Sequence, residues 1–165
     1  SDGTVSAVQF GSAGDRIVPG DYDGDGKTDV AVFRPSNGVW YLQTSAEGFR
    51  AAQFGQIGDI PAQGDFDGDG KTDLAVFRTS TGTWFLMQSR DGFAAVQFGL
   101  NLDKPVAGDY DGDGRTDIGV FRPSSGVWFI LQSRDGFTAA QFGISTDKVA
   151  PQDFDGDGKA DFAVF

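Results

Sequence analysis

A nine-residue acidic loop occurs four times in this chain at a constant spacing of 44 residues, and it restricts the possible folds more than any other feature. Each copy follows the pattern D-[YF]-D-G-D-G-[KR]-[TA]-D. The copies span residues 21–29, 65–73, 109–117 and 153–161. A pattern that returns at a fixed period of this length is typical of a repeat protein, in which each period is one supersecondary unit.

The charge of the loop predicts a bound cation. Four aspartates stand at positions 1, 3, 5 and 9, and one Lys or Arg at position 7 is the only base. Two carboxylates ~4 Å apart repel by about 4 kcal/mol at an effective dielectric constant of ~20. Calcium takes about 6–8 oxygen ligands in a flexible shell, and glycine at position 6 allows the sharp turn that such loops need. We therefore expect one Ca²⁺ in each loop, about four per chain.

The expected ligands are the four carboxylates and the backbone carbonyl of position 7. They are Asp21, Asp23, Asp25, Lys27 and Asp29 in the first loop, Asp65, Asp67, Asp69, Lys71 and Asp73 in the second, Asp109, Asp111, Asp113, Arg115 and Asp117 in the third, and Asp153, Asp155, Asp157, Lys159 and Asp161 in the fourth.

The loop is not an EF-hand. An EF-hand needs an acid at position 12 and a helix on each side. Position 12 is Val32, Val76, Val120 or Val164, and each valine lies in an apolar run that reads as a buried strand.

Composition excludes several classes of function. The net charge is -11, but 16 of the 24 acids lie in the four loops, so most of the acidity is ligand charge. The chain has no basic patch for a nucleic acid and no apolar stretch long enough for a membrane span. It has no cysteine and no histidine, which excludes disulfides, zinc sites and histidine catalysis. We expect no enzyme; a glycosidase-like carboxylate pair is the one alternative left. Several calcium loops favour a calcium-replete, secreted or cell-surface location.

The residues between the loops predict four short strands in each unit. In the second unit these are 60–65, 74–78, 83–89 and 93–98, separated by the loop and by two turns. Four strands per 44 residues is the blade of a β-propeller. The expected fold is an all-β propeller in one domain, 1–165, with units of about 15–58, 59–102 and 103–146 and a split unit of 1–14 plus 147–165.

Aromatic and arginine side chains also return every 44 residues. Tryptophans at 40, 84 and 128 and phenylalanines at 33, 77 and 121 are expected to fill the space between blades. The alternative is a glycan-binding set made of Arg34, Trp40, Arg78, Trp84, Arg122 and Trp128, although the arginines are also expected to seal the blade edges.

The fourth unit lacks a segment equivalent to 34–44. Residues 4–10 supply a fourth strand, and residues 149–153 and 161–165 supply a first and a second. Three arrangements are open: a piece of a larger propeller, a four-bladed ring with a three-stranded last blade, or several chains that share strands. Exposed strand edges favour self-association.

The loops, with the Phe-Gly pair that ends each unit, resemble the FG-GAP/VCBS repeat family of integrin α-subunits and bacterial secreted proteins. The pairs begin at residues 10, 54, 98 and 142, while the family's Gly-Ala-Pro signature is here Phe-Arg-Pro or Phe-Arg-Thr. The resemblance implies that the loop joins the first two strands of each blade and binds Ca²⁺ through positions 1, 3, 5, 7 and 9.

The expected function is a calcium-stabilised, non-enzymatic propeller module for recognition, adhesion or scaffolding. One alternative is a lectin-like propeller with glycan sites between blades. Another is a designed or evolutionary repeat fragment whose property is self-assembly into a larger propeller.

Overall fold

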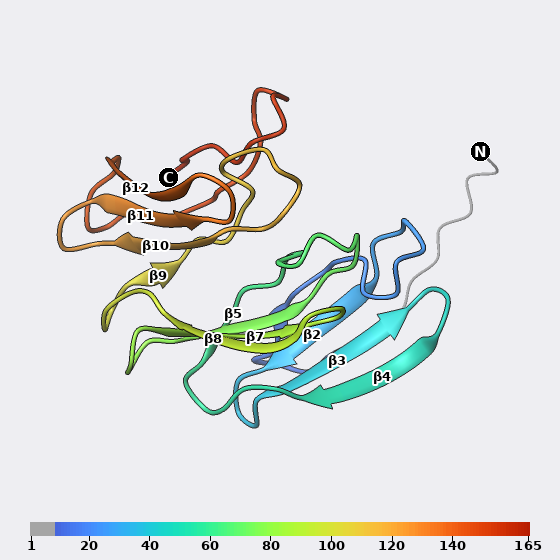
Figure 1. Ribbon diagram of the computed structural model, residues 1–165. Helices are drawn as coiled ribbons and strands as arrows, with labels where there is room; N and C mark the ends of the chain where they lie inside the picture. Colours follow the sequence, from blue (N-terminus) through green and yellow to red (C-terminus); the bar gives the residue numbers. More distant parts are fainter. Residues whose placement is uncertain (1–8) are drawn as a thin grey trace.

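The described part of the chain is built from β-strands alone. The structure is a computed structural model that describes residues 9–165, so most of the strand expected at 4–10 lies outside the described residues. Residues 9–165 contain three four-stranded antiparallel sheets and no helix (Figure 1). Each sheet is one 44-residue repeat, and its strands pair in chain order.

The three sheets have matching strand lengths. The first contains β1 (Arg16–Ile17), β2 (Val30–Arg34), β3 (Val39–Thr44) and β4 (Gly48–Gln53). The second contains β5 (Ile60–Pro61), β6 (Leu74–Arg78), β7 (Thr83–Gln88) and β8 (Gly92–Gln97). The third contains β9 (Lys104–Pro105), β10 (Ile118–Arg122), β11 (Val127–Gln132) and β12 (Gly136–Gln141).

The first strand of each unit is shorter than the sequence predicts. The second unit was expected to have a strand at 60–65, but β5 ends at Pro61. The pairing continues through a hydrogen bond from Ala62 N–H to the Ala75 carbonyl and a single bridge from Gly64 to Asp73. The chain therefore leaves the regular ladder as it bends into the acidic loop.

The fourth unit forms a reduced version of the same hairpin. Val149 pairs with Val164 and Gln152 with Asp161 through isolated bridges, in place of continuous strands. Lys148 and Phe165 exchange two backbone hydrogen bonds of 2.9 and 3.0 Å. The acidic loop of this unit, like the other three, connects two antiparallel segments.

The core lies between successive sheets, because each sheet packs one face on the next. Val18, Phe33 and Trp40 of the first unit pack against Val76 of the second. Phe77 and Trp84 of the second pack in the same way against the third, and Phe121 and Trp128 of the third against the fourth. We call the side with the tryptophan the Trp face and the opposite side, with the valine, the Val face.

The middle strands are buried on both faces, as their apolar sequences predict. Consecutive residues of β6 that point to opposite sides, Ala75, Val76 and Phe77, are all buried. A strand with a neighbouring sheet on each side has no solvent face, which explains why its residues do not alternate between apolar and polar.

Candidate metal centre

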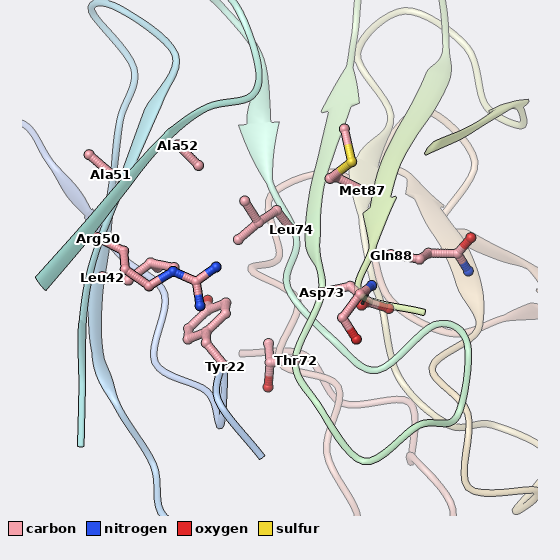
Figure 2. Close-up of a pocket in the computed structure, with 11 residues that line it drawn as sticks. Tyr22, Leu42, Arg50, Ala51, Ala52, Thr72, Asp73, Leu74, Met87 and Gln88 are labelled. Carbon is pink, nitrogen blue, oxygen red and sulfur yellow. Dashed lines mark hydrogen bonds between the residues drawn. The ribbon is translucent and has the colours of Figure 1, made fainter. Parts of the chain in front are cut away.

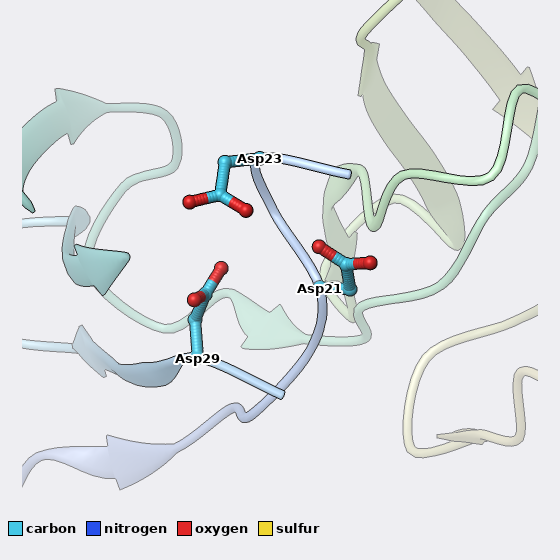
Figure 3. A group of neighbouring side chains, drawn as sticks. All are labelled: Asp21, Asp23 and Asp29. Atoms are coloured by element: carbon cyan, nitrogen blue, oxygen red, sulfur yellow. The ribbon is translucent and has the colours of Figure 1, made fainter. Parts of the chain in front are cut away.

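Three carboxylates converge in every acidic loop. One oxygen from each aspartate at positions 1, 3 and 9 lies within 4.8 Å of the other two, in all four copies. Figure 3 shows this arrangement for Asp21, Asp23 and Asp29, whose carboxyl groups point toward one another from different parts of the loop. The other groups are Asp65, Asp67 and Asp73; Asp109, Asp111 and Asp117; and Asp153, Asp155 and Asp161.

The aspartate at position 1 shapes the loop. In the first copy, Asp21 Oδ1 accepts a hydrogen bond from Gly24 N–H at 2.7 Å and Oδ2 accepts one from Gly26 N–H at 2.8 Å. Gly24 and Gly26 have φ angles of 79° and 82°, which a side chain would strain. The same pair of bonds recurs in the other three loops. The loop therefore wraps around its own first carboxylate.

A turn far along the chain holds positions 3 and 9 in the first three units. The turn between β3 and β4 brings Ser45 N–H to Asp29 Oδ1 at 2.8 Å and Ala46 N–H to Asp23 Oδ2 at 2.8 Å. Asp29 Oδ2 also accepts a bond from Tyr22 N–H at 2.9 Å. These donors hold both carboxylates in place, and one oxygen of each lies within 4.8 Å of the other ligands of the triad.

The position-5 aspartates lie outside the triads. Asp25 Oδ2 accepts bonds from Ser45 Oγ at 2.5 Å and Lys27 Nζ at 2.8 Å, and Oδ1 accepts one from Lys27 N–H at 2.9 Å. Asp69 and Asp113 accept the equivalent serine bonds. Sequence reasoning missed these serines, which are Ser45, Ser89 and Ser133. Their 44-residue spacing was the signal available, but the contact with the loop appears only when the hairpin folds back.

A buried carboxylate oxygen without a donor indicates that the site suits a cation. Among the described residues, Asp67 Oδ1 is buried and has no hydrogen-bond partner, while Oδ2 accepts bonds from Arg90 and Asp91 N–H at 2.9 and 3.0 Å. A buried polar atom without a partner costs about 1–3 kcal/mol, and more when it is charged. A hard cation within the triad would satisfy this oxygen, so the residues fit a calcium ion.

Burial also perturbs two of the position-9 acids, Asp73 and Asp117. Burial raises the pKa of Asp73 to about 6, with a further rise from the nearby charges of Asp67 and Asp65, against the opposing effect of its two backbone donors. The pKa of Asp117 is raised for the same reasons. Both carboxyl groups therefore lack nearby positive charge, which a bound cation would supply.

The fourth site is more open than the other three. Asp153 and Asp155 are exposed, and Asp161 is half-buried. Phe154 N–H still donates to Asp161 Oδ2 at 2.9 Å, but within residues 9–165 no turn supplies a donor equivalent to that of Ser45. This site should be the weakest of the four.

The tryptophans belong to the core. Trp40, Trp84 and Trp128 are each 0% exposed, and each packs against the phenylalanine paired with it on the adjacent strand, with ring centroids 5.3–5.6 Å apart. Trp40 Nε1 donates to the Phe54 carbonyl at 2.8 Å. The sugar-stacking role considered from the sequence has no exposed indole face to use, since packing occupies both sides.

The repeated arginines are engaged at the sheet edges. Arg78 donates through Nε and Nη2 to buried Asp59, at 3.0 and 2.9 Å, and its guanidinium stacks on Phe85 at 4.2 Å. Arg34 with Asp15 and Arg122 with Asp103 repeat this geometry. Planar bidentate pairing suits arginine and leaves few of its donors for a ligand.

Small hollows lie between the sheets beside position 9. Figure 2 shows the one between the first two sheets, about 190 Å³ in volume, with Tyr22 and Thr72 near its floor and Arg50 at one side. An equivalent hollow of about 240 Å³ lies between the second and third sheets. Neither hollow is lined by a tryptophan or by Arg34, Arg78 or Arg122.

Comparison with known proteins gives one clear result. A protein-family model described as an FG-GAP-like repeat matches residues 21–76, 65–120 and 109–164. Each match begins at the first aspartate of a loop and ends beyond the loop of the next unit. Neither the curated proteins nor the solved structures gives a significant match. No helix suited to crossing a membrane occurs in the described residues.

Proposed function

This chain belongs to the FG-GAP-like repeat family, and on that basis we propose that it is a calcium-binding, non-enzymatic β-propeller module for recognition, adhesion or scaffolding. The family is typical of extracellular and cell-surface proteins, where calcium is plentiful, and we propose the same location here. The observation that carries the proposal is the repeated aspartate triad with its fixed donors and, at Asp67, a buried oxygen that has no partner.

The proposed role of calcium is structural. Each of the first three loops connects the first strand of a sheet to the second, and the turn after the third strand also contacts it. An ion bound to the aspartates of positions 1, 3 and 9 would therefore tie three strands of one blade together. We propose that position 5 and the position-7 carbonyl complete the shell, as the family pattern implies.

The propeller arrangement is supported by the packing of successive sheets. Each sheet places its Trp face on the Val face of the next, and the same contact occurs three times along the chain. Repeating one rotation between neighbours is how propeller blades are placed around an axis.

Calorimetric titration with calcium tests the metal proposal. Metal-stripped protein should bind three to four ions, the fourth loop being the weakest. The variant Asp67→Asn should lose one of the tight sites, because Asp67 belongs to the second triad. Asp91→Asn is the matched control, since Asp91 is an exposed neighbour that pairs with Arg90. Absence of binding heat and of bound calcium by equilibrium dialysis in the unmodified protein would refute the proposal.

We further propose that copies of the chain associate through faces of the first and fourth units. Phe154 is 64% exposed, whereas the equivalent Tyr22, Phe66 and Tyr110 are 6–8% exposed beneath a neighbouring sheet. On the first unit, Val30 is 48% exposed, whereas its equivalent Ile118 is 8% exposed. The surface at Phe154 on the fourth unit is a Trp face, and the surface at Val30 on the first unit is a Val face. Within the chain, Trp faces pack on Val faces.

Light scattering in calcium tests the association. The proposal predicts a discrete oligomer that Phe154→Ser disrupts. Phe137→Ser is the control, because Phe137 is equally exposed, at 63%, but lies on the outer strand β12. A monomer in calcium at all concentrations would contradict the proposal.

A further inference from the structure

Consecutive acidic loops are joined by a backbone hydrogen bond. The N–H of position 8 in each loop donates to the carbonyl of position 1 in the loop before it. Thr72 donates to Asp21, Thr116 to Asp65, and Ala160 to Asp109, each at 2.6 Å. Position 8 lies between the carbonyl of position 7 and the carboxylate of position 9. The hydrogen bond therefore links the segment that carries the proposed ligands of positions 7 and 9 in one loop to the residue that supplies the position-1 ligand of the preceding loop.

The residue before each of the first three loops is a glycine because the next loop lies against it. A Cβ on Gly20 would lie 2.6 Å from Thr72 Oγ1, and one on Gly64 would lie 2.5 Å from Thr116 Oγ1. A Cβ on Gly108 would lie 2.8 Å from Ala160 Cβ. The fourth loop has Gln152 at this position, and Gln152 is exposed. The pattern of glycines follows the loop contact.

The base at position 7 also reaches the preceding loop. A Cβ on Gly24 would lie 2.9 Å from Lys71 Cε, and one on Gly68 would lie 3.0 Å from Arg115 Cγ. Arg115 Nη2 also donates to the Asp67 carbonyl at 2.7 Å. Each of these loops is thus covered by a side chain whose own backbone belongs to the next loop.

From these contacts we propose that the loops bind calcium cooperatively, so that an occupied loop raises the affinity of the loops on either side. An ion fixes the position-1 residue of its own loop. This orients the carbonyl that holds position 8 of the next loop, and the neighbouring site is then ordered before its ion arrives. The inference rests on the proposed calcium binding and adds to it a coupling between sites.

Charge alone would act in the opposite direction. Each loop carries four aspartates and one base, so the first ion removes part of the negative potential that attracts the second. This long-range effect is weakened by salt, since the screening length is ~8 Å at ~0.15 M ionic strength. A Hill coefficient above 1 in physiological salt therefore reports the structural contact and not the charge.

The test is a calcium titration of the metal-stripped chain in physiological salt, followed by competition with a chromophoric chelator. We expect a Hill coefficient above 1, with an affinity gain of about 5-fold or more between adjacent loops. The variant Gly64→Ala should reduce this coefficient, because its methyl group pushes the second and third loops apart without altering any carboxylate.

Two further variants separate a loop contact from a general defect. Thr116→Gly keeps the N–H donor and should retain the cooperativity. The double variant Gly64→Ala/Thr116→Gly removes the clash and should restore it, and circular dichroism confirms that each variant is folded.

The possible failures are distinguishable. If the unmodified chain binds no calcium, the proposed function fails. If it binds several ions with a Hill coefficient of 1 or below, the proposed function stands and the coupling is overturned. The coupling is also overturned if folded Gly64→Ala retains the original coefficient.

Discussion

At the scale of single residues, the arginine–aspartate pairs are the charged contacts most important to stability. Asp103 is almost fully buried, and Arg122 is its bidentate partner while also stacking on Phe129. Removing one partner leaves a charge in a poorly solvated place, whereas exposed ion pairs contribute little.

The variant Arg122→Met should lower the free energy of unfolding by about 2–3 kcal/mol, somewhat less than for a fully buried pair, because Arg122 is partly exposed. Arg50→Met is the control, since Arg50 pairs with Glu47 at the surface, and it should cost under about 1 kcal/mol. Urea unfolding in calcium measures both. Equal losses in the two variants would contradict this account.

The carboxyl groups of Asp73 and Asp117 predict how pH affects the metal-free protein. The pKa of Asp73 is about 6 in the folded chain, above the ~3.9 of an unfolded aspartate. The folded state therefore binds more protons between these two values, and its stability rises as pH falls from 7 through 6. The aspartates whose pKa is lowered, such as Asp69 and Asp113, lose their stabilising effect only at more acidic pH.

Melting of metal-stripped protein should therefore occur at a higher temperature at pH 5.5 than at pH 7.5. With calcium present the order should reverse, because the ligands must be ionised to bind the ion. A metal-free melting temperature that is equal at the two pH values, or lower at pH 5.5 than at pH 7.5, would show that Asp73 does not have the raised pKa of a buried acid.

At the scale of elements, the turn before β9 contains one residue with an unfavourable backbone conformation. Leu102 has a φ angle of 74°, where the equivalent residues Gly14 and Gly58 have 89° and 91°. The left-handed region costs a non-glycine residue about 1–2 kcal/mol.

Leu102→Gly should therefore raise the free energy of unfolding, by about 0.5–1 kcal/mol after the extra entropy that glycine loses on folding. Little apolar burial is lost, since Leu102 is 77% exposed. Leu100→Gly is the control, because Leu100 is also exposed but has no positive φ, and it should destabilise the chain. The prediction is wrong if both variants are destabilised equally in urea.

The sequence predicted the strands of each unit well and their cross-connections poorly. The strand β6 begins and ends where predicted, because its apolar run is bounded by the loop and by a Thr-Ser-Thr-Gly turn. The role of Ser89 was not foreseen, since its bond to Asp69 joins residues 20 positions apart, and the 44-residue spacing of the serines does not say what they contact. The loop pattern predicted that the carboxylates of positions 1, 3, 5 and 9 converge. Positions 1, 3 and 9 do so, whereas Asp69 at position 5 lies outside its triad and accepts the bond from Ser89.

At the scale of the whole molecule, the sequence predicted that repeated aromatic residues fill the space between units. Aromatic residues at 44-residue spacing indicated packing between units, and the Trp face of each sheet does lie on its neighbour. The number of units in a ring depends on the angle between neighbouring sheets. Many side chains determine this angle together, so it cannot be predicted from a single sequence motif. The exposed surfaces at Val30 and Phe154 are a Val face and a Trp face, the two kinds of face that pack on each other between successive units.

Calcium is proposed to stabilise the fold by tying together the strands of each unit, and thermal unfolding of the whole chain tests this role most directly. We would compare metal-stripped protein with the same sample in ~2 mM calcium, a concentration suited to extracellular sites. Each loop occupied at ~100 Kd adds about 2.7 kcal/mol, and each kcal/mol raises the melting temperature by about 2–4 °C. Two or more occupied loops should therefore raise it by roughly 10 °C or more. Identical melting temperatures with and without calcium would contradict the claim.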